Sequence, residues 1–266
     1  MTQPNIESTP GPTPITSSSG RHFRYYDLVM VGFVTVLLCS NLIGPGKSCA
    51  VDVGASVVPG WSSEHGLIFT SLLVFGAGNI FFPISYIFGD ILTEVYGYAR
   101  ARKVIWAGFG AMIFATVMST VVLSLPANPN EDFNKVIVPA LEVVFGNTWR
   151  IVIASILAFW VGDFVNSYVL AKLKVWTNGR FLWLRTISST ICGQGVDSLI
   201  FYPVAFYGIW ETETLLAVSI FNWLFKVSVE VVFTPVTYLV VGFLKRAEGV
   251  DVYDRETNFT PFSLKD

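Results

Sequence analysis

The sequence predicts an all-α fold: a polytopic membrane protein built as a bundle of six transmembrane helices. Of its 266 residues, 53% are hydrophobic and only 14% are charged, whereas soluble domains carry about 25% charged residues. The apolar residues also gather in runs close to the ~20 residues that a helix needs to cross about 30 Å of hydrocarbon. A chain of this composition is too apolar for water, and its long runs suit a bilayer.

Six apolar runs predict the six helices. We expect them at residues 26–44, 66–88, 104–125, 149–173, 186–209 and 215–244. The second should continue through an acidic pair to Gly97, and residues 136–145 should form a short interfacial helix. Residues 1–24 are rich in Pro, Ser and Thr and are expected to be a disordered tail. Residues 25–246 then form the transmembrane domain, and residues 247–266 form a second polar tail.

The positively charged residues predict the orientation of this bundle. One side receives Arg21, Arg24, Arg100, Arg102, Lys103, Lys172, Lys174, Arg180, Arg185, Lys245 and Arg246. The other side receives only Lys47, Lys135 and Arg150. Because Lys and Arg of short loops stay in the cytoplasm, both tails are predicted to be cytoplasmic. The net charge of −2 gives no basic surface for binding a nucleic acid, so none is expected as a partner. The apolar runs make the lipid bilayer the expected partner of this chain.

Several ionisable residues fall inside or at the edge of the apolar runs. They are Asp90, Glu94, Asp163, Asp197, Lys226 and Glu230. A central Asp or Lys raises the free energy of helix insertion by about 2.5–3.5 kcal/mol, and such residues usually serve a substrate, ion or proton pathway. Asp90 and Glu94 lie one turn apart on one helical face, and similar spacing recurs elsewhere. The further pairs are Asp163 with Asn166, and Gln194 with Asp197.

The role of these groups has more than one interpretation. Lys226 and Glu230 are one turn apart and could form a structural or gating pair. One lysine cannot neutralise five acids, so the surplus is protonated, solvated in a cavity, or reserved for a substrate with hydrogen-bond donors or positive charge. Asn41 and Asn79 are better explained as hydrogen-bonding links between helices.

The sequence predicts neither a metal site nor a cofactor. Its two histidines, His22 and His65, lie outside the apolar runs, so an intramembrane histidine site is excluded. Cys39 and Cys192 lie inside apolar runs and are explained as packing residues. A P-loop is also absent from the sequence, and an enzyme is therefore not favoured.

Helix breakers and aromatic residues accompany the acidic faces. Pro83, Pro203 and Pro235 interrupt predicted helices, which frees backbone carbonyls and lets helices kink around a cavity. The aromatic residues nearby are Phe81, Phe82, Tyr86, Trp160, Tyr168, Phe201, Tyr202 and Trp223. Most should pack or face lipid, and those on acidic faces could stack on a flat ring.

A set of motifs extends over residues 27–246. In the first half these are Phe82-Pro83, Tyr86, Asp90, Thr93-Glu94-Val95-Tyr96-Gly97 and Ala101-Arg102-Lys103. In the second half they are Gly162-Asp163-Phe164-Val165-Asn166, Ser188-Ser189-Thr190, Gly193-Gln194, Asp197-Ser198, Phe201, Lys226-Val227, Glu230, Thr234-Pro235 and Tyr238. The joint pattern resembles the queuosine precursor transporter family. The chain departs from it at Asp163, where the family is expected to have glutamine.

This resemblance implies a bacterial inner-membrane importer of 7-cyano-7-deazaguanine or 7-aminomethyl-7-deazaguanine, precursors used in tRNA modification. A guanine-like edge presents a ring N–H and an exocyclic amine, and one carboxylate can accept both hydrogen bonds. Resemblance and chemistry together point to the following residues. The expected ligand or coupling acids are Asp90, Glu94 and Asp197. The expected hydrogen-bond partners of the base edge are Asp163, Asn166 and Gln194. The expected structural or gating pair is Lys226 with Glu230.

A rival interpretation belongs to a different functional class. In it, the chain captures another vitamin-like heterocycle and needs an ATP-driven partner to move it. Energy coupling is also open, because the surplus acids permit proton coupling, whereas facilitated diffusion with intracellular trapping needs none. The sequence is compatible with a homo-oligomer.

Overall fold

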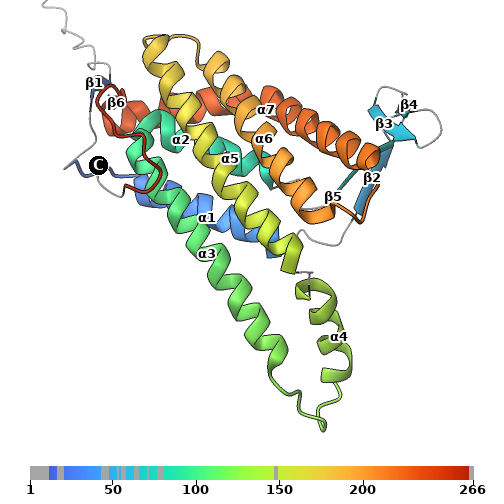
Figure 1. Cartoon of the computed structure of the whole chain (residues 1–266). Coiled ribbons are helices and arrows are strands. Elements are labelled where there is room, and N and C mark those ends of the chain that lie inside the picture. Colours follow the sequence, from blue (N-terminus) through green and yellow to red (C-terminus); the bar gives the residue numbers. More distant parts are fainter. Residues whose placement is uncertain are drawn as a thin grey trace, which may run out of the picture.

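The computed structural model describes residues 12–16, 21–42, 48–52, 54, 58–62, 66–70, 72–76, 81–146 and 149–263, which are mostly helical (Figure 1). The helices of this described part are α1 (Tyr26–Leu42), α2 (Phe82–Tyr96), α3 (Tyr98–Ser124), α4 (Asn134–Phe145), α5 (Trp149–Trp176), α6 (Leu182–Phe206) and α7 (Thr212–Glu248). The predicted helix at residues 136–145 is confirmed as α4. Asn79 and residues 1–11 lie outside the described residues.

Three of the described helices are long and apolar enough to cross a membrane. They are the segments Tyr98–Ser124, Arg150–Trp176 and Val218–Glu248, and α1 is apolar but shorter. Large apolar side chains stand on outer faces, as Phe114 and Leu239 do with exposed fractions of 67% and 74%. Such surface is unfavourable in water and favourable against lipid. The chain is therefore a helical membrane protein, and the count of six spans stays a prediction.

The prediction of a helix from residue 66 is wrong, because short strands occupy its first part. Strand β4 (Gly66–Thr70) pairs antiparallel with β3 (Val58–Ser62), and β5 (Leu72–Gly76) pairs antiparallel with β2 (Ser48–Asp52). Helix α2 begins only at Phe82. Short apolar runs do not distinguish a strand from a helix, and the β-branched and aromatic residues of this run fit a strand.

Residues 250–263, which belong to the predicted C-terminal tail, fold back onto the bundle. Strand β6 (Val250–Val252) pairs in parallel with β1 (Thr13–Ile15), which also orders part of the predicted N-terminal tail. The Arg102 guanidinium donates to the carbonyl oxygens of Asn258 and Thr260, both at 2.7 Å. The indole N–H of Trp106 donates to the carbonyl of Pro261 at 2.8 Å. Arg102 and Trp106 of α3 therefore hold residues 258–261 against the bundle, and for Arg102 this is a role that the count of loop charges did not reveal.

The two ends of the bundle differ. Figure 1 shows β1, β6 and the C-terminal segment at one end, which we call the terminal end, and β2 to β5 at the other. Helix α3 begins at Tyr98, six residues earlier than predicted, so the basic cluster Arg100, Arg102 and Lys103 lies in its first turns. Arg100 donates to the carbonyl of Arg21 there at 2.8 Å. The structure thus gathers these basic residues at the terminal end.

Helices α5 and α6 form the most extensive helix pair of the bundle, and two glycines allow their close approach. A β-carbon on Gly193 would lie 2.7 Å from Cβ of Asn166 and 2.9 Å from the carbonyl oxygen of Gly162. A β-carbon on Gly162 would lie 3.0 Å from Cβ of Asp197. Small residues let backbones meet in membrane bundles, so these glycines set where the polar residues of α5 and α6 face each other.

We expect Gly193→Ala to lower the thermal stability of the protein in detergent. The added methyl group would overlap Asn166 unless the helices separate, and overpacking of this kind typically costs about 1–3 kcal/mol. Gly110→Ala is the matched control, because a β-carbon on Gly110 meets no described atom within 4 Å. It should keep or slightly raise the melting temperature, since alanine favours a helix interior. Equal melting temperatures for the two variants would contradict the close packing.

Candidate functional site

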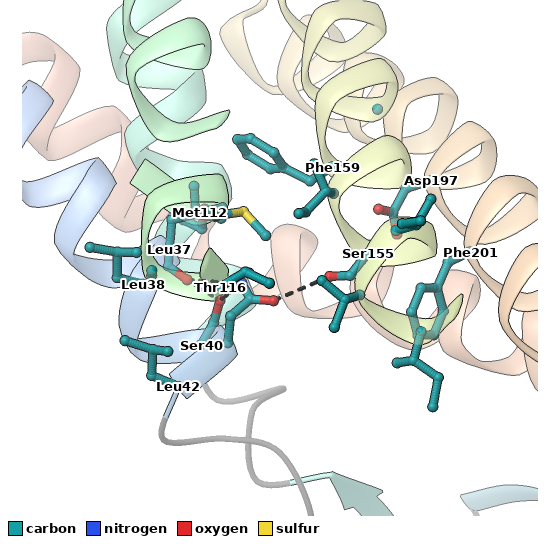
Figure 2. A pocket seen from close by; sticks show the side chains of 18 of the residues that line it. Leu37, Leu38, Ser40, Leu42, Met112, Thr116, Ser155, Phe159, Asp197 and Phe201 are labelled. Carbon is teal, nitrogen blue, oxygen red and sulfur yellow. Dashed lines mark hydrogen bonds between the residues drawn. The ribbon is translucent and has the colours of Figure 1, made fainter. Parts of the chain in front are cut away.

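A cavity of about 990 Å³ lies among α1, α2, α3, α5, α6 and α7 and is partly open. This volume is at the upper end of the ~300–1,000 Å³ of small-molecule sites. Its lining reaches Leu42 at the end of α1, Gly146 before α5 and Trp210 after α6. These points lie at the helix ends away from β1 and β6. Figure 2 shows Asp197 and Phe201 facing Leu37, Ser40, Met112 and Thr116 across the cavity.

One wall of the cavity carries charged and amide groups. The Lys226 ammonium donates to Asp197 Oδ2 at 2.6 Å and to Gln194 Oε1 at 3.2 Å. The Tyr86 hydroxyl donates to the same Gln194 oxygen at 2.5 Å. Asp163 also lines the cavity, and its Oδ2 is buried without a hydrogen-bond partner in the part of the chain that the structure describes. The wall thus has one ion pair already formed and one carboxylate oxygen still able to accept.

The remaining walls combine flat rings with hydroxyl groups. Phe201, Tyr202, Phe206 and Trp210 line the side formed by α6 and the residues after it. The rings of Phe206 and Trp210 are stacked with centroids 4.0 Å apart. Across the cavity, the Ser155 hydroxyl donates to Asn41 Oδ1 at 3.2 Å, which links α5 to α1 (Figure 2). The interpretation of Asn41 as a link between helices is confirmed, although it also lines the cavity.

Two carboxyl groups lie behind the cavity wall and do not line it. Asp90 on α2 and Glu230 on α7 both have fully buried side chains. Asn166 donates to Asp90 Oδ1 at 2.9 Å. Asp90 Oδ2 and both oxygens of Glu230 have no hydrogen-bond partner among the described residues. Among the described residues Lys226 therefore does not hydrogen-bond to Glu230, its predicted partner, and instead forms an ion pair with Asp197 on α6.

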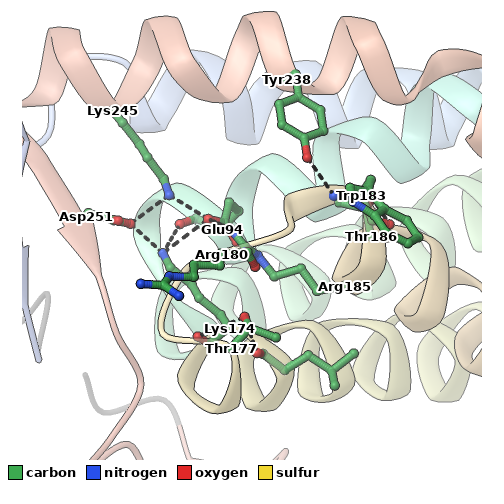
Figure 3. Close-up of polar contacts among 11 residues, drawn as sticks. Glu94, Lys174, Thr177, Arg180, Trp183, Arg185, Thr186, Tyr238, Lys245 and Asp251 are labelled. Atoms are coloured by element: carbon green, nitrogen blue, oxygen red, sulfur yellow. Dashed lines mark hydrogen bonds and ion pairs between the residues drawn. The ribbon is translucent and has the colours of Figure 1, made fainter.

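Glu94 is the centre of an ion cluster at the terminal end (Figure 3). Arg185 makes a two-point contact with its carboxylate, through Nε at 2.8 Å and Nη2 at 2.7 Å. Lys245 contacts Glu94 Oε1 at 2.5 Å and Asp251 Oδ1 at 2.7 Å. Lys174 donates to the Glu94 carbonyl and to Asp251, both at 2.6 Å. These residues, which we call the Glu94 cluster, tie α2, α5, α6, α7 and β6 together.

The structure separates the predicted site residues into three groups. Asp163, Gln194 and Asp197 line the cavity, Asp90 and Asn166 lie behind it, and Glu94 belongs to the cluster at the terminal end. Sequence reasoning missed Arg185, Lys174 and Lys245 as partners of Glu94, because it assigned all three to loops or helix ends as orientation signals. It also missed Phe206 and Trp210. A binding role for any of these residues stays a prediction.

Comparison with known proteins identifies relatives of this chain. The family model described as "Putative vitamin uptake transporter" matches residues 76–240. The "Probable queuosine precursor transporter" of Bacillus subtilis (strain 168) is 35% identical over 163 residues, which cover 60% of this chain and 69% of the relative. The "Queuosine precursor transporter" of Escherichia coli (strain K12) is 28% identical, with 59% and 67% covered. A relative of the same kind from Haemophilus influenzae is 27% identical, with 67% and 73% covered. No solved structure is significantly similar.

Replacing Glu94 by glutamine should destabilise the protein strongly. The change removes the anion that Arg185 and Lys245 contact, and breaking a buried ion pair typically costs about 3–5 kcal/mol. The measurement is the melting temperature of the purified protein in detergent. Glu213→Gln, at an exposed position in the first turn of α7, is the control and should melt with the wild type. A Glu94→Gln protein as stable as that control would show that the cluster does not hold the bundle together.

Proposed function

Because the chain belongs to the queuosine precursor transporter family, we propose that it imports the 7-deazaguanine precursors of queuosine into a bacterial cell. Membership rests on a family match over residues 76–240 and on relatives named for this activity. The chain is a transporter embedded in a membrane. The proposal adds the cargo, 7-cyano-7-deazaguanine or 7-aminomethyl-7-deazaguanine, and the residues that bind it.

The observation that carries the proposal is the unpartnered carboxylate oxygen of Asp163 on the cavity wall. A deazaguanine presents its ring N–H and exocyclic amine side by side, and one carboxylate accepts both in a charge-assisted contact. The neighbouring carbonyl of the base can accept a hydrogen bond from Lys226 or from the Gln194 amide. Asp163 thus recognises the edge of the base that distinguishes a guanine-like ring.

Flat rings on the same cavity support a flat substrate. Phe201 and Tyr202 line it beside Asp197, and stacking of a base on an aromatic ring contributes about 1–3 kcal/mol. An aminomethyl group would add a positive charge, which Asp163 and Asp197 tolerate better than a neutral wall would. The cavity therefore combines the two contacts that bind nucleobases, ring stacking and edge hydrogen bonding.

The asymmetry of the bundle supports alternating access around this cavity. The cavity lining extends to the helix ends away from β1 and β6, while the Glu94 cluster closes the terminal end. Basic residues gather at the terminal end, which supports a cytoplasmic location for that end and for the two predicted tails by the positive-inside rule. In this proposal the chain is a multi-pass protein of the inner membrane. The described conformation then opens the cavity toward the outside of the cell, from which substrate enters.

The test uses a bacterium that can neither make nor import the precursor, supplied with 7-cyano-7-deazaguanine. Wild-type protein should restore queuosine in tRNA. Asp163→Asn should slow uptake at low substrate about tenfold or more, because a hydrogen bond to a charged group contributes about 1.5–3 kcal/mol. Asp132→Asn makes the same chemical change at a side chain that is 91% exposed outside the cavity, and it should transport like the wild type.

Two results would contradict this assignment. If wild-type protein reaches the membrane without restoring queuosine, the cargo is wrong. If purified protein in liposomes moves the base only with an added ATP-driven partner, the chain is a binding subunit. Membrane levels of each variant are measured by immunoblot, so that loss of uptake is not mistaken for loss of protein.

A further inference from the structure

The two carboxyl groups behind the cavity, those of Asp90 and Glu230, lie between the cavity and the Glu94 cluster. Asp90 follows the cavity residue Tyr86 by one turn of α2 and precedes Glu94 by one turn. Glu230 follows the cavity residue Lys226 by one turn of α7, which packs against α2. Along α2 and α7, the two carboxyl groups thus lie between the cavity and the Glu94 cluster.

Neither carboxyl group has the partners that a buried charge requires. Both side chains are fully buried, and three of the four carboxyl oxygens have no hydrogen-bond partner among the described residues. An isolated buried carboxylate is far less stable than its neutral form. The two groups also interact electrostatically with each other, and two neighbouring carboxyls do not both ionise readily. Burial without partners therefore favours a protonated carboxyl at this position.

The ionisable neighbours do not supply the missing positive charge. Lys226 is bonded to Asp197 and Gln194, and Arg185, Lys174 and Lys245 belong to the Glu94 cluster. The groups on each element packed against the pair are Tyr86 and Glu94 of α2, Asp163 of α5, Asp197 of α6, Lys226 of α7, Arg102 of α3 and Asp251 of β6. On α1, Tyr26 and Asp27 lie in its first turn at the terminal end. The two cations in this list, Lys226 and Arg102, bond to other groups, and neither donates to the unpartnered oxygens of the pair.

We propose that Asp90 and Glu230 form a proton-binding site that couples uptake of the base to the proton gradient. In the described conformation a proton from the cavity side rests on one of the two carboxyls. When the Glu94 cluster separates to open the terminal end, water reaches the pair and the proton leaves to the cytoplasm. The deprotonated carboxylates then favour a return to the described conformation, in which the pair binds the next proton from the cavity side. This inference rests on the proposed function, and it assigns the energy source of transport.

The experiment reconstitutes the purified full chain in liposomes that contain a pH-sensitive dye, in sodium-free buffer. Uptake of 7-cyano-7-deazaguanine and acidification of the interior are measured together after the outside is acidified. A gradient of one pH unit supports accumulation of up to about tenfold for one proton per base, which corresponds to 1.4 kcal/mol. Wild-type protein should accumulate the base and acidify the interior in proportion.

Glu230→Gln should abolish both accumulation and acidification, while exchange of labelled for unlabelled base across the membrane continues. Asp90→Asn is the second variant, for the case in which Glu230→Gln does not fold. Glu213→Gln, exposed on the same helix α7, is the control and should behave as the wild type in both readouts.

The outcomes separate the inference from the proposed function. If wild-type protein exchanges the base but ignores the pH gradient, or requires added sodium, the proton site is wrong and the transport function stands. If Glu230→Gln and Asp90→Asn still couple accumulation to acidification, the site has been assigned to the wrong residues. If the wild type neither exchanges nor accumulates the base, the proposed cargo itself fails.

Discussion

Glu94 and its three cationic partners are the interaction on which the arrangement of this bundle depends. A carboxylate with no exposed surface is tolerated among apolar helices only when positive charge and hydrogen bonds replace its hydration. Arg185, Lys174 and Lys245 supply both, and each comes from a different helix. The same requirement therefore fixes four helices relative to one another at one end of the bundle. At the other end, where no such cluster is described, the cavity lining reaches the helix ends.

The interior polar groups follow a graded pattern along the bundle. The Glu94 cluster is saturated with partners, Asp90 and Glu230 have almost none, and the cavity wall is intermediate, with Asp197 paired and Asp163 able to accept. A fully paired group is rigid, whereas an unpaired one can change its protonation or bind a ligand. The close contact of α5 and α6 at Gly162 and Gly193 brings Asp163 and Asp197 to the same wall. The positions at which α5 and α6 pack closely thus also determine which polar groups line the cavity.

Much of the fold can be predicted from the sequence, because apolar runs near twenty residues leave few alternatives to membrane helices. The acids of these runs also identify the polar interior, and three of the six predicted site residues do line the cavity. The helix predicted from residue 66 is wrong over its first part, since a short apolar run suits a strand as well as a helix. The partners of Glu94 could not be found either. They lie 80, 91 and 151 positions away, and helical spacing reports only neighbours within one helix.

The order in which the chain is synthesised gives the Glu94 cluster a consequence for membrane insertion. Glu94 leaves the ribosome before Lys174 and Arg185, and Lys245 is the last of the four to emerge. Helix α2 has only 15 residues, so it is short for an independent span and carries an acid without its counter-charges during that interval. Its final position in the bundle therefore depends on α7, and the Glu94 cluster forms only after α7 has been synthesised.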